Sequence, residues 1–534
     1  MSRSGSSVNV DSKASYPPSD SHAWQGDREI EIKFKTDAAG MKHVAASQLL
    51  GAAGEAQVQN LRTIYFDTPS NDLRKHGIVL RIRKKGRAAP VLGFKSSAGK
   101  GSSPFARKEV EVRSRELKPN LALFENGTAD ALVAIVADQP LEQKFEMRVK
   151  RRITSVESGP SRIEVALDVG HIIVGKQRVP LREVELELKS GNEADLHDFA
   201  MRLTAELPLR LDFVAKSEKG FHALTCEYLA PVKATAIKLD PKAMLDDMVV
   251  AVISSALTHF AANWALLRAN DSPESIHQMR VALRRMRSAF MMFKWAVPCP
   301  DIDVLRDEAK AIASAMGTAR NCDAFRMAAE QGPLLHIDRP KGCDALFAAL
   351  EKRRTVAYKD VRAVIESSRA TLFVLKLQSF LVRRSWRNVA TGTDLPQAQP
   401  TAREFAKATL DKLNGRVLKR GKGLSDLSDT QRHELRIALK NLRYGMDFCG
   451  ELFGRHRPEP SYFKKISMLQ DLLGAHNDVV SAKSLLDQLL TGLGPDAEKA
   501  AGFILGWYAR EAIIADKKIS KAWKKFKGTE TFWT

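Results

Sequence analysis

The chain has 534 residues, 44% of them hydrophobic, and a formal net charge of +21. This length exceeds one ordinary domain, so we expect two or three. The excess charge is uneven, because residues 1–230 carry 35 Lys and Arg against 30 Asp and Glu, whereas the remainder carries 49 against 33. A polyanionic partner is therefore expected for the second part, and nucleic acid, polyphosphate and anionic lipid all fit the charge alone.

The cysteines and the first residues of the chain indicate a reducing compartment. The five cysteines are scattered without a C-x-x-C pair, which argues against a disulfide framework and a zinc site. Residues 1–26 are polar and Ser-rich, with no apolar core for a signal peptide. No run approaches the roughly 18 apolar residues that cross a bilayer. We therefore expect a cytoplasmic protein without a membrane partner and with a disordered leader over 1–26.

Residues 27–228 form the first expected domain, and from 28 to about 190 they show the two-residue period of half-buried strands. The first stretch, 28–37, reads REIEIKFKTD, and similar alternation follows at 61–67, 78–84, 91–95, 107–113, 145–153, 161–168 and 182–189. Helical patterns interrupt it at about 38–52 and 192–206. These stretches, separated by Gly, Pro and Ser turns, predict about eight strands in an all-β or α+β first domain.

The polar faces of these strands are unusually uniform in charge. Glu29, Glu31 and Lys33 share one face, three glutamates alternate over 183–187, and two arginines alternate over 81–83. Water alone explains most single charged faces, but like charges in a row repel unless an ion of opposite charge lies among them. If the sheet closes with these faces inward, the carboxylates can hold a hard divalent cation and the basic residues can bind phosphate.

Together these segments resemble the CYTH family, the triphosphate tunnel metalloenzymes, over about residues 27–225. The resemblance lies in E-x-E-x-K at 29–33, YFDT at 65–68, LRIR at 80–83, E-x-E-x-E at 183–187 and AKS at 215–217. It implies an eight-stranded antiparallel tunnel with opposed acidic and basic walls. It also implies cleavage or cyclisation of triphosphates with Mg²⁺ or Mn²⁺.

Carried over by position, the resemblance implies three sets of site residues. The metal ligands would be Glu29, Glu31, Glu183, Glu185 and Glu187. The substrate phosphates would be bound by Arg62, Arg81, Arg83, Lys95, Arg107 and Arg151. The catalytic residues would be Lys33, Glu185 and Lys216. We find no nucleophile with an activating base, and none is required, because phosphoryl transfer depends mainly on positioning and charge neutralisation.

The second part of the chain predicts an all-α domain with an internal duplication. Residues 229–243 have the composition of a linker, and helical periodicity fills 244–525, apart from a break at 390–401. Residues 276–294 match 432–450 at an offset of 156, and a Gly-led turn after each helix, at 317–323 and 474–478, repeats as well. We expect two helical bundles related by a pseudo-two-fold axis.

The duplicated helices resemble the CHAD family over about residues 245–520, which implies binding of inorganic polyphosphate in a basic groove. A lone basic helix face is usually solvated, but two such faces near an axis would repel each other without an anion. One departure is Asn321, where an Asp is expected. The histidines could instead cap or brace helices. The groove residues would be His277, Arg280, Arg284, Arg287, Arg320, His433, Arg436, Lys440, Arg443 and His476.

The sequence thus predicts an α+β protein in which a CYTH tunnel precedes a CHAD domain. The expected activity is metal-dependent hydrolysis of the terminal phosphoanhydride of a linear triphosphate, most simply inorganic tripolyphosphate. Adenylate cyclisation, thiamine triphosphate hydrolysis and a non-catalytic polyphosphate-binding or granule protein are alternatives. Nucleic acid is a poorer candidate, because no RRM, zinc-finger or helix-turn-helix signature is present. The oligomeric state and any coupling between the domains stay open.

Overall fold

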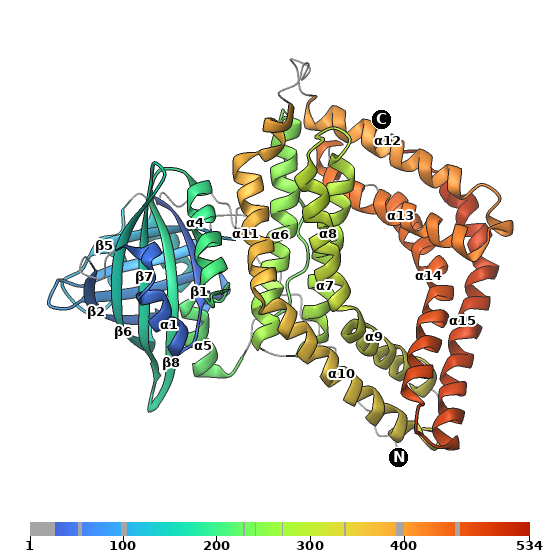
Figure 1. Cartoon of the computed structure of the whole chain (residues 1–534), viewed down its shortest axis with the longest axis horizontal. Coiled ribbons are helices and arrows are strands. Elements are labelled where there is room, and N and C mark those ends of the chain that lie inside the picture. Colours follow the sequence, from blue (N-terminus) through green and yellow to red (C-terminus); the bar gives the residue numbers. More distant parts are fainter. Residues whose placement is uncertain are drawn as a thin grey trace.

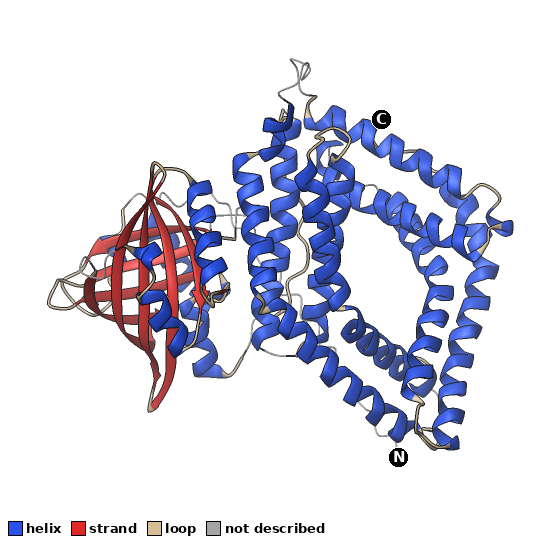
Figure 2. Cartoon of the chain, in the orientation of Figure 1, coloured by secondary structure: helices blue, strands red, loops and turns tan. Residues whose placement is uncertain are grey.

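The computed structural model describes residues 27–533 except 52–55, 98–103, 126, 228–229, 241, 270, 336–337, 391–399 and 454–459. A β barrel forms its first part and a helical assembly its second (Figures 1 and 2). The fold class is as predicted. The predicted leader at 1–26 lies outside the described residues.

Eight antiparallel strands close into the barrel. Their order is β5-β4-β3-β2-β6-β7-β8-β1, and a β1–β5 pairing closes the sheet, while the short β9 (Arg210–Leu211) pairs with β1. Each predicted strand is present, most of them longer than the pattern indicated. Their bounds are β1 Asp27–Lys35, β2 Gln57–Asp67, β3 Ile78–Lys85, β4 Val91–Ser97, β5 Ala106–Arg113, β6 Glu142–Ser158, β7 Ser161–Val174 and β8 Gln177–Ser190.

The apolar strand faces point outward and are covered by helices. Ile32 and Val184 pack in one core with Phe199 of α4 (Glu193–Glu206) and Val44 of α1 (Ala38–Ala45). A second cluster covers β2, β3 and β4 with α2 (Asp72–Lys75) and α3 (Thr128–Val136), helices that the sequence did not predict. Because the apolar faces are covered outside, the charged faces are left to line the interior.

One end of the barrel interior is apolar and closed by a helix. Leu61, Tyr65, Phe145 and Met147 form a cluster there with Phe221 of α5 (Lys216–Thr225). Tyr65 stacks on Phe145 with ring centroids 4.6 Å apart, and Phe145 meets Phe221 edge-on at 5.3 Å. The charged part of the interior therefore ends at this cluster.

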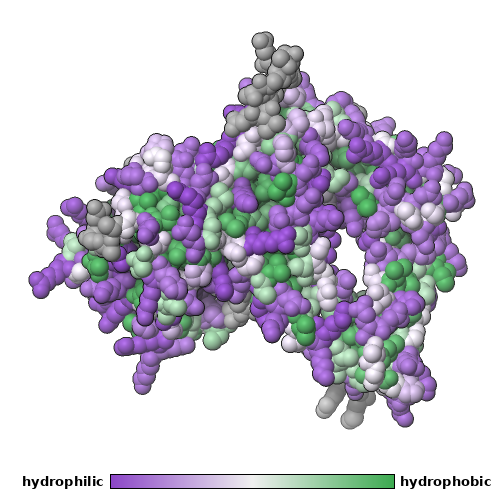
Figure 3. All heavy atoms as spheres, in the orientation of Figure 1, coloured by the Kyte–Doolittle hydropathy of each residue, from purple (hydrophilic) through white to green (hydrophobic). Residues whose placement is uncertain are grey.

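The helical part surrounds an opening that is also visible between the side-chain spheres (Figures 1 and 3). Helices α7, α9, α13 and α14 border it (Figure 1). The helix bounds are α6 Leu245–Ala269, α7 Pro273–Phe293, α8 Pro300–Ala315, α9 Gly317–Gln331, α10 Cys343–Ile365, α11 Ser368–Arg383, α12 Ala402–Arg420, α13 Asp429–Cys449, α14 Pro460–Leu489 and α15 Pro495–Lys527.

The barrel and the helices share one interface. Helix α4 packs along α11, where Arg383 donates to Asp198 and Ser379 donates to Asp198 at 3.2 Å. The backbone N–H of Leu211 donates to Thr371 Oγ1 at 3.2 Å. The main apolar cluster continues from the outer barrel face into the helical bundle, so the two parts are packed together.

The expectation that no run is apolar enough to cross a membrane was wrong for α6. Its residues Leu245–Leu267 have a mean hydropathy of 1.5 and the length of a span. However, 72% of the most apolar window is buried inside the protein. Trp264 and Phe260, for example, are almost completely buried. This apolarity is that of a core helix, which is enclosed by protein on most of its circumference.

Candidate functional site

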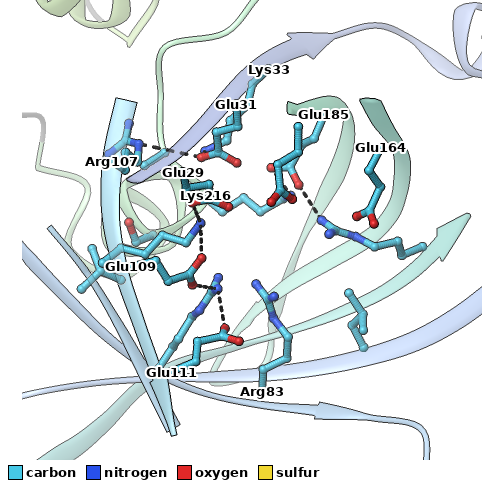
Figure 4. A pocket seen from close by; sticks show the side chains of 18 of the residues that line it. Glu29, Glu31, Lys33, Arg83, Arg107, Glu109, Glu111, Glu164, Glu185 and Lys216 are labelled. Carbon is cyan, nitrogen blue, oxygen red and sulfur yellow. Dashed lines mark hydrogen bonds and ion pairs between the residues drawn. The ribbon is translucent and has the colours of Figure 1, made fainter. Parts of the chain in front are cut away.

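A cavity of about 340 Å³ lies inside the barrel and is lined by all eight strands of the closed barrel and the start of α5. Side chains of alternate residues meet there from opposite walls (Figure 4). Most of the predicted tunnel residues line it: Glu29, Glu31, Lys33, Arg81, Arg83, Lys95, Arg107, Arg151, Glu185, Glu187 and Lys216. Strand closure thus brings together residues that are up to 187 positions apart in the chain.

Lys216 holds a group of carboxylates on one side of the cavity. Its Nζ lies 2.6 Å from Asp168 Oδ2, 2.7 Å from Glu185 Oε1 and 3.1 Å from Glu183 Oε2. Arg151 contacts both Asp168, at 2.6 Å, and Glu185, at 2.5 Å. Burial opposes the charge of Glu185, but Lys216 and Arg151 outweigh it and hold its pKa well below the usual range. Glu185 is therefore ionised.

A second group of ion pairs lies on the β3–β4–β5 side. Arg81 donates to Glu109 and, at 3.2 Å, to Glu111. Lys95 Nζ lies 2.5 Å from Glu29 and 3.1 Å from Glu109. Burial favours the neutral form of Glu109, but Arg81 and Lys95 outweigh it and lower its pKa to about 2. The two sides of the cavity therefore each carry mixed acidic and basic groups rather than one sign.

Arg83 is the exception among these paired charges. Its Nε is buried without a hydrogen-bond partner, and no carboxylate of the described residues lies within 4.0 Å of its guanidinium. Burial, and then the nearby Arg81 and Arg151, lower its pKa. An unpaired buried cation is costly unless an anion accompanies it. The cavity therefore favours an anion at Arg83.

The carboxylates at β1 fit a hard divalent cation by donor type. Burial opposes ionisation of Glu31, but Lys33 and Lys95 outweigh it and lower its pKa to about 2, while burial raises the pKa of Glu29. Among the described residues, no three His, Cys, Asp or Glu side chains gather closely enough to hold a metal ion by themselves. Mg²⁺ commonly takes one or two carboxylates together with substrate phosphate oxygens, and this donor set suits that mode.

Two predicted tunnel residues do not line the cavity. Arg62 was predicted wrongly, because its side chain is on the outer barrel face, where it donates to Glu146 at 2.8 Å. Residues 61 and 65 of the same strand line the interior, and a one-residue change moves a side chain to the other face. Glu183 is fully buried and does not line the cavity, and its carboxylate contacts Lys219 and Lys216.

The sequence prediction missed several acidic residues of the site. Asp168 is 1% exposed and joins Arg151 to Lys216. Glu109 and Glu111 alternate on β5, and Glu164 lines the cavity from β7. The signal was available, since Glu164 and Asp168 have the same parity on one predicted strand. The sequence does not give the register of β7 with its neighbouring strands, so it did not show that these even-numbered residues face the barrel interior.

The predicted groove residues form a cluster of like charge between the two helical repeats. In the first repeat, besides burial, Arg284 contributes to lowering the pKa values of its neighbours His277, Arg280 and Arg287, and Arg320 does so for His277 and Arg280. For Lys440 of the second repeat, Arg284, Arg436 and Arg443 all contribute to lowering the pKa. Within the described chain, none of the six arginines in this cluster, nor Lys440, has a carboxylate within 4.0 Å. Burial, followed by Arg436 and Arg284, lowers the pKa of Lys440 to about 8.

The two repeats place their first arginine in the same way. The guanidinium of Arg280 lies over Gly317, where an added Cβ would stand 3.7 Å from Nη1. In the second repeat, Arg436 lies over Gly474 with the same 3.7 Å separation from Nη2. Arg280 also donates to the carbonyl oxygen of Ala313. The duplicated sequence motif therefore corresponds to a duplicated structural arrangement.

Two histidines lie at the edge of this cluster. His433 is exposed and lines a pocket of about 210 Å³ with Arg436 and His476. His476 Nε2 lies 2.8 Å from Asp516 Oδ2 of α15, and Arg432 donates to the same carboxylate at 2.9 Å. His476 thus braces α14 against α15. In the first repeat, Asn321 removes the negative charge that Asp478 brings near Arg436 and Lys440 in the second.

Comparison with known proteins identifies both parts. The CYTH domain model matches residues 27–221, and the CHAD domain model matches residues 251–487. The inorganic triphosphatase of Haemophilus influenzae is 30% identical over 200 residues, which cover 36% of this chain and 54% of that protein. The match thus spans about half the length of this relative. Two uncharacterized proteins from strains of Mycobacterium tuberculosis are 23% identical over 522 residues, 92% of this chain and 94% of theirs.

Among solved structures, the CHAD domain from the plant Ricinus communis is 27% identical, with a TM-score of 0.49, and the match covers 57% of this chain and 99% of that one. The charged barrel interior and the duplicated basic helices coincide with the two family matches. The chain therefore belongs to the proteins in which a CYTH domain, here residues 27–221, precedes a CHAD domain, here residues 251–487.

Proposed function

We propose that the barrel is a metal-dependent triphosphatase that hydrolyses the terminal phosphoanhydride of inorganic tripolyphosphate. The observation that carries this proposal is the half-buried Arg83, whose Nε has no partner, in a cavity where, among the described residues, the other buried and half-buried cations contact carboxylates. A phosphate chain would supply the missing negative charge. The inorganic triphosphatase relative supports the same reaction class.

The roles of the residues follow from their contacts. Arg81, Arg83, Lys95, Arg107 and Arg151 would bind phosphate oxygens and neutralise the charge that develops as the anhydride bond breaks. Lys216 would stay protonated, because the three carboxylates around it raise its pKa against the effect of burial. Glu185, held ionised by Lys216 and Arg151, would orient the attacking water rather than accept its proton.

A divalent cation would be held by one or two carboxylates of the set Glu29, Glu31, Glu185 and Glu187, together with phosphate oxygens. Bound there, Mg²⁺ or Mn²⁺ would supply charge neutralisation on the phosphates and polarise water. The buried Glu183 would support the site through Lys216 instead of binding the cation directly. Of the three glutamates of β8 that were predicted as metal ligands, Glu185 and Glu187 line the cavity and keep that role in the proposal.

The lining favours an inorganic chain over a nucleotide. Among the described residues that line the cavity, the one aromatic ring is that of Tyr65, which is 4% exposed and already stacked on Phe145. A nucleobase would need a free aromatic face or a polar edge. The products would be phosphate and pyrophosphate, with the water proton released to solvent or to a phosphate oxygen.

The test is a phosphate-release assay with tripolyphosphate, long-chain polyphosphate, ATP and thiamine triphosphate. We expect release from tripolyphosphate with Mg²⁺ or Mn²⁺, none with EDTA, and a large loss in Glu29→Gln. The matched control is Glu142→Gln on the outer face, a residue that is 51% exposed. Equal rates with and without EDTA, or a faster reaction with a nucleotide, would contradict the proposal.

For the helical part, we propose polyphosphate binding by the basic cluster around Arg284 and Lys440. Seven cations without a close carboxylate need an anion, and a polyphosphate chain offers evenly spaced charges. Changing Arg280, Arg284, Arg436 and Lys440 to Ala should abolish binding that is steeply salt-dependent in the wild type. The control changes four cations outside the cluster, Arg326, Arg369, Lys483 and Lys499, to Ala. Equal affinities of the two variants would contradict the groove.

We also propose a cytoplasmic location in which the helical part retains the enzyme near polyphosphate, in solution or at granules. Joining two phosphate sites in one chain raises the effective concentration of substrate at the second. Fractionation of cells with and without polyphosphate stores would test this placement.

A further inference from the structure

The last helix carries a surface that neither the tunnel nor the groove explains. Between Asp516 and Glu530 the sequence holds six lysines and no acidic residue. These residues lie beyond residue 487, where the match to the CHAD domain ends. We call this surface the α15 lysine face; its members are Lys517, Lys518, Lys521, Lys524, Lys525 and Lys527.

The lysines occupy one half of the helix surface. At about 100° per residue they fall within an arc of about 180°, and from Lys517 to Lys527 they extend about 15 Å. The opposite half is apolar and buried by Ile519, Trp523 and Phe526. All six lysines are exposed, and within the described part of the chain none of their ammonium groups has an ion-pair or hydrogen-bond partner. The ammonium groups are therefore available to a ligand.

Ordinary helix electrostatics account for only part of this surface. The negative end of the helix dipole favours cations in the last turn, which covers Lys524, Lys525 and Lys527. It does not reach Lys517 or Lys521, and like charges four residues apart destabilise a helix by about 0.2–0.5 kcal/mol per pair. In the first half of α15, by contrast, basic residues have acidic neighbours, as in the ion pair of Lys499 with Asp496 at 3.6 Å.

The α15 lysine face begins at the wall of the proposed groove. Asp516, which directly precedes Lys517, lines the same pocket as His433 and Arg436 of the second repeat. At its other end, the ring of Trp523 packs on Gly421, so closely that an added Cβ would stand 2.1 Å from it. This contact places the exposed end of α12, with further cations, beside the end of α15 at the upper right of Figure 1. Hydrophilic side chains cover this corner in Figure 3.

We propose that the α15 lysine face is a second polyphosphate-binding surface, which takes up the part of a long chain that extends beyond the groove. The proposal rests on the proposed polyphosphate binding by the groove. Lysine ammonium groups are mobile point charges without the forked geometry of arginine, and they suit a uniform, flexible polyanion. The face offers no exposed aromatic ring for stacking a base, since Trp523 is buried, which favours inorganic polyphosphate over nucleic acid.

The test compares short and long polyphosphate on the full chain. In a variant with Lys517, Lys521 and Lys524 changed to Gln, affinity for chains of about 15 phosphates should stay within about twofold, because the groove alone holds them. Affinity for chains of about 100 phosphates should fall at least about 10-fold, and its salt dependence should become less steep. The control changes Lys483 and Lys499 to Gln, which should alter neither affinity. Thermal unfolding should be unchanged or slightly higher, since repulsion is relieved.

Each contrary outcome has a distinct meaning. If the lysine variant binds both chain lengths like the wild type, the face is only solvated and the inference is overturned while the groove stands. If both affinities fall equally, the lysines belong to the groove and no second surface exists. If the wild type binds neither chain, the groove proposal fails, and the inference fails with it. A DNA duplex that binds the wild type more tightly than polyphosphate, and loses this in the variant, would replace the proposed partner class.

Discussion

Arg284 and Lys440, equivalent residues of the two helical repeats, lie close enough for Arg284 to contribute to the lowered pKa of Lys440. They are 156 positions apart, the offset of the duplication itself. The pseudo-two-fold arrangement thus brings one cation from each repeat together. Two such groups resist close approach unless an anion lies between them.

This relationship predicts that polyphosphate affinity falls above about pH 8. Burial, Arg436 and Arg284 lower the pKa of Lys440 to about 8 in the free protein, so the ammonium loses its proton as the pH rises through that value. A bound polyanion favours the charged form and raises this pKa, so binding above pH 8 requires proton uptake and weakens with pH. Titration calorimetry between pH 6.5 and 9.5 measures the affinity, which should fall by at most about tenfold per pH unit above pH 8.

The variant Lys440→Arg supplies the comparison. A guanidinium stays charged over this range, so its affinity should be nearly independent of pH. If the wild type and Lys440→Arg show the same pH profile, Lys440 is not the group that titrates.

Arg83→Gln should reduce triphosphatase activity strongly without unfolding the barrel. The change removes a half-buried cation without a carboxylate partner, so the free energy of unfolding should stay equal or rise. Loss of one group that stabilises phosphate charge should lower kcat by about 10²–10³-fold. Phosphate release and urea denaturation measure the two effects. Arg148→Gln, at a side chain that is 64% exposed on the outer face, should change neither. A destabilised Arg83→Gln protein would indicate a structural role.

Lys216→Met should destabilise the protein most at neutral pH. It leaves Asp168, Glu183 and Glu185 buried without their shared cation, a change of about 3–5 kcal/mol for a broken buried pair. Lys216 lowers the pKa of Asp168 and Glu185 in the folded wild type. Without Lys216, burial raises the pKa of these carboxyl groups, so the folded variant takes up protons as the pH falls towards 4.5 and recovers part of the lost stability. Urea denaturation at pH 7.5 and pH 4.5 should show a smaller difference from the wild type at the lower pH.

An opposite trend, with the larger loss at pH 4.5, would show that Lys216 contributes through packing rather than charge. The exposed Lys150 on β6 provides the control variant Lys150→Met, which should have little effect at either pH.

Gly220→Ala should destabilise the closed end of the barrel. An added Cβ would stand 2.1 Å from Cε2 of Phe145, a ring that is 1% exposed and held by Tyr65 and Phe221. Overpacking of this kind costs about 1–3 kcal/mol. Gly506→Ala in α15 has open space around the new methyl group and should stabilise the helix by about 0.5–1 kcal/mol. Thermal unfolding should show a lower melting temperature for Gly220→Ala than for Gly506→Ala. Equal melting temperatures of the two variants would contradict the close packing of Gly220 against Phe145.

The sequence was informative wherever a local pattern sufficed. Strict alternation located all eight strands of the closed barrel, and the charged parity of β1, β3 and β8 marked many of the charged residues that line the cavity. The repeat offset located α7 and α13 and their basic residues. The sequence analysis did not predict α5, the helix that closes the barrel end, because a helix of ten residues with one buried ring shows little hydrophobic periodicity.

Parity alone was insufficient at Arg62 and Asp168. On β2 the residues that face the cavity have odd numbers, so the side chain of Arg62 lies on the outer face. Asp168 is paired opposite Arg151 of β6, and this register places both side chains on the inner face of the barrel. Such pairings depend on register between distant strands.

By itself, the amino-acid sequence determined the element types, the order of the two domains, the duplication and the set of charged residues available to each site, because these depend on local periodicity and composition. The tertiary structure decided which face of each strand is enclosed and which carboxylates are neutralised by Lys216 and Lys95. It also decided that the half-buried Arg83 has no carboxylate partner among the described residues. An open, solvated sheet has the same alternation as a closed barrel. The pairing of β1 with β5, whose paired residues are about 80 positions apart, closes the sheet, so that the charged strand faces enclose a cavity.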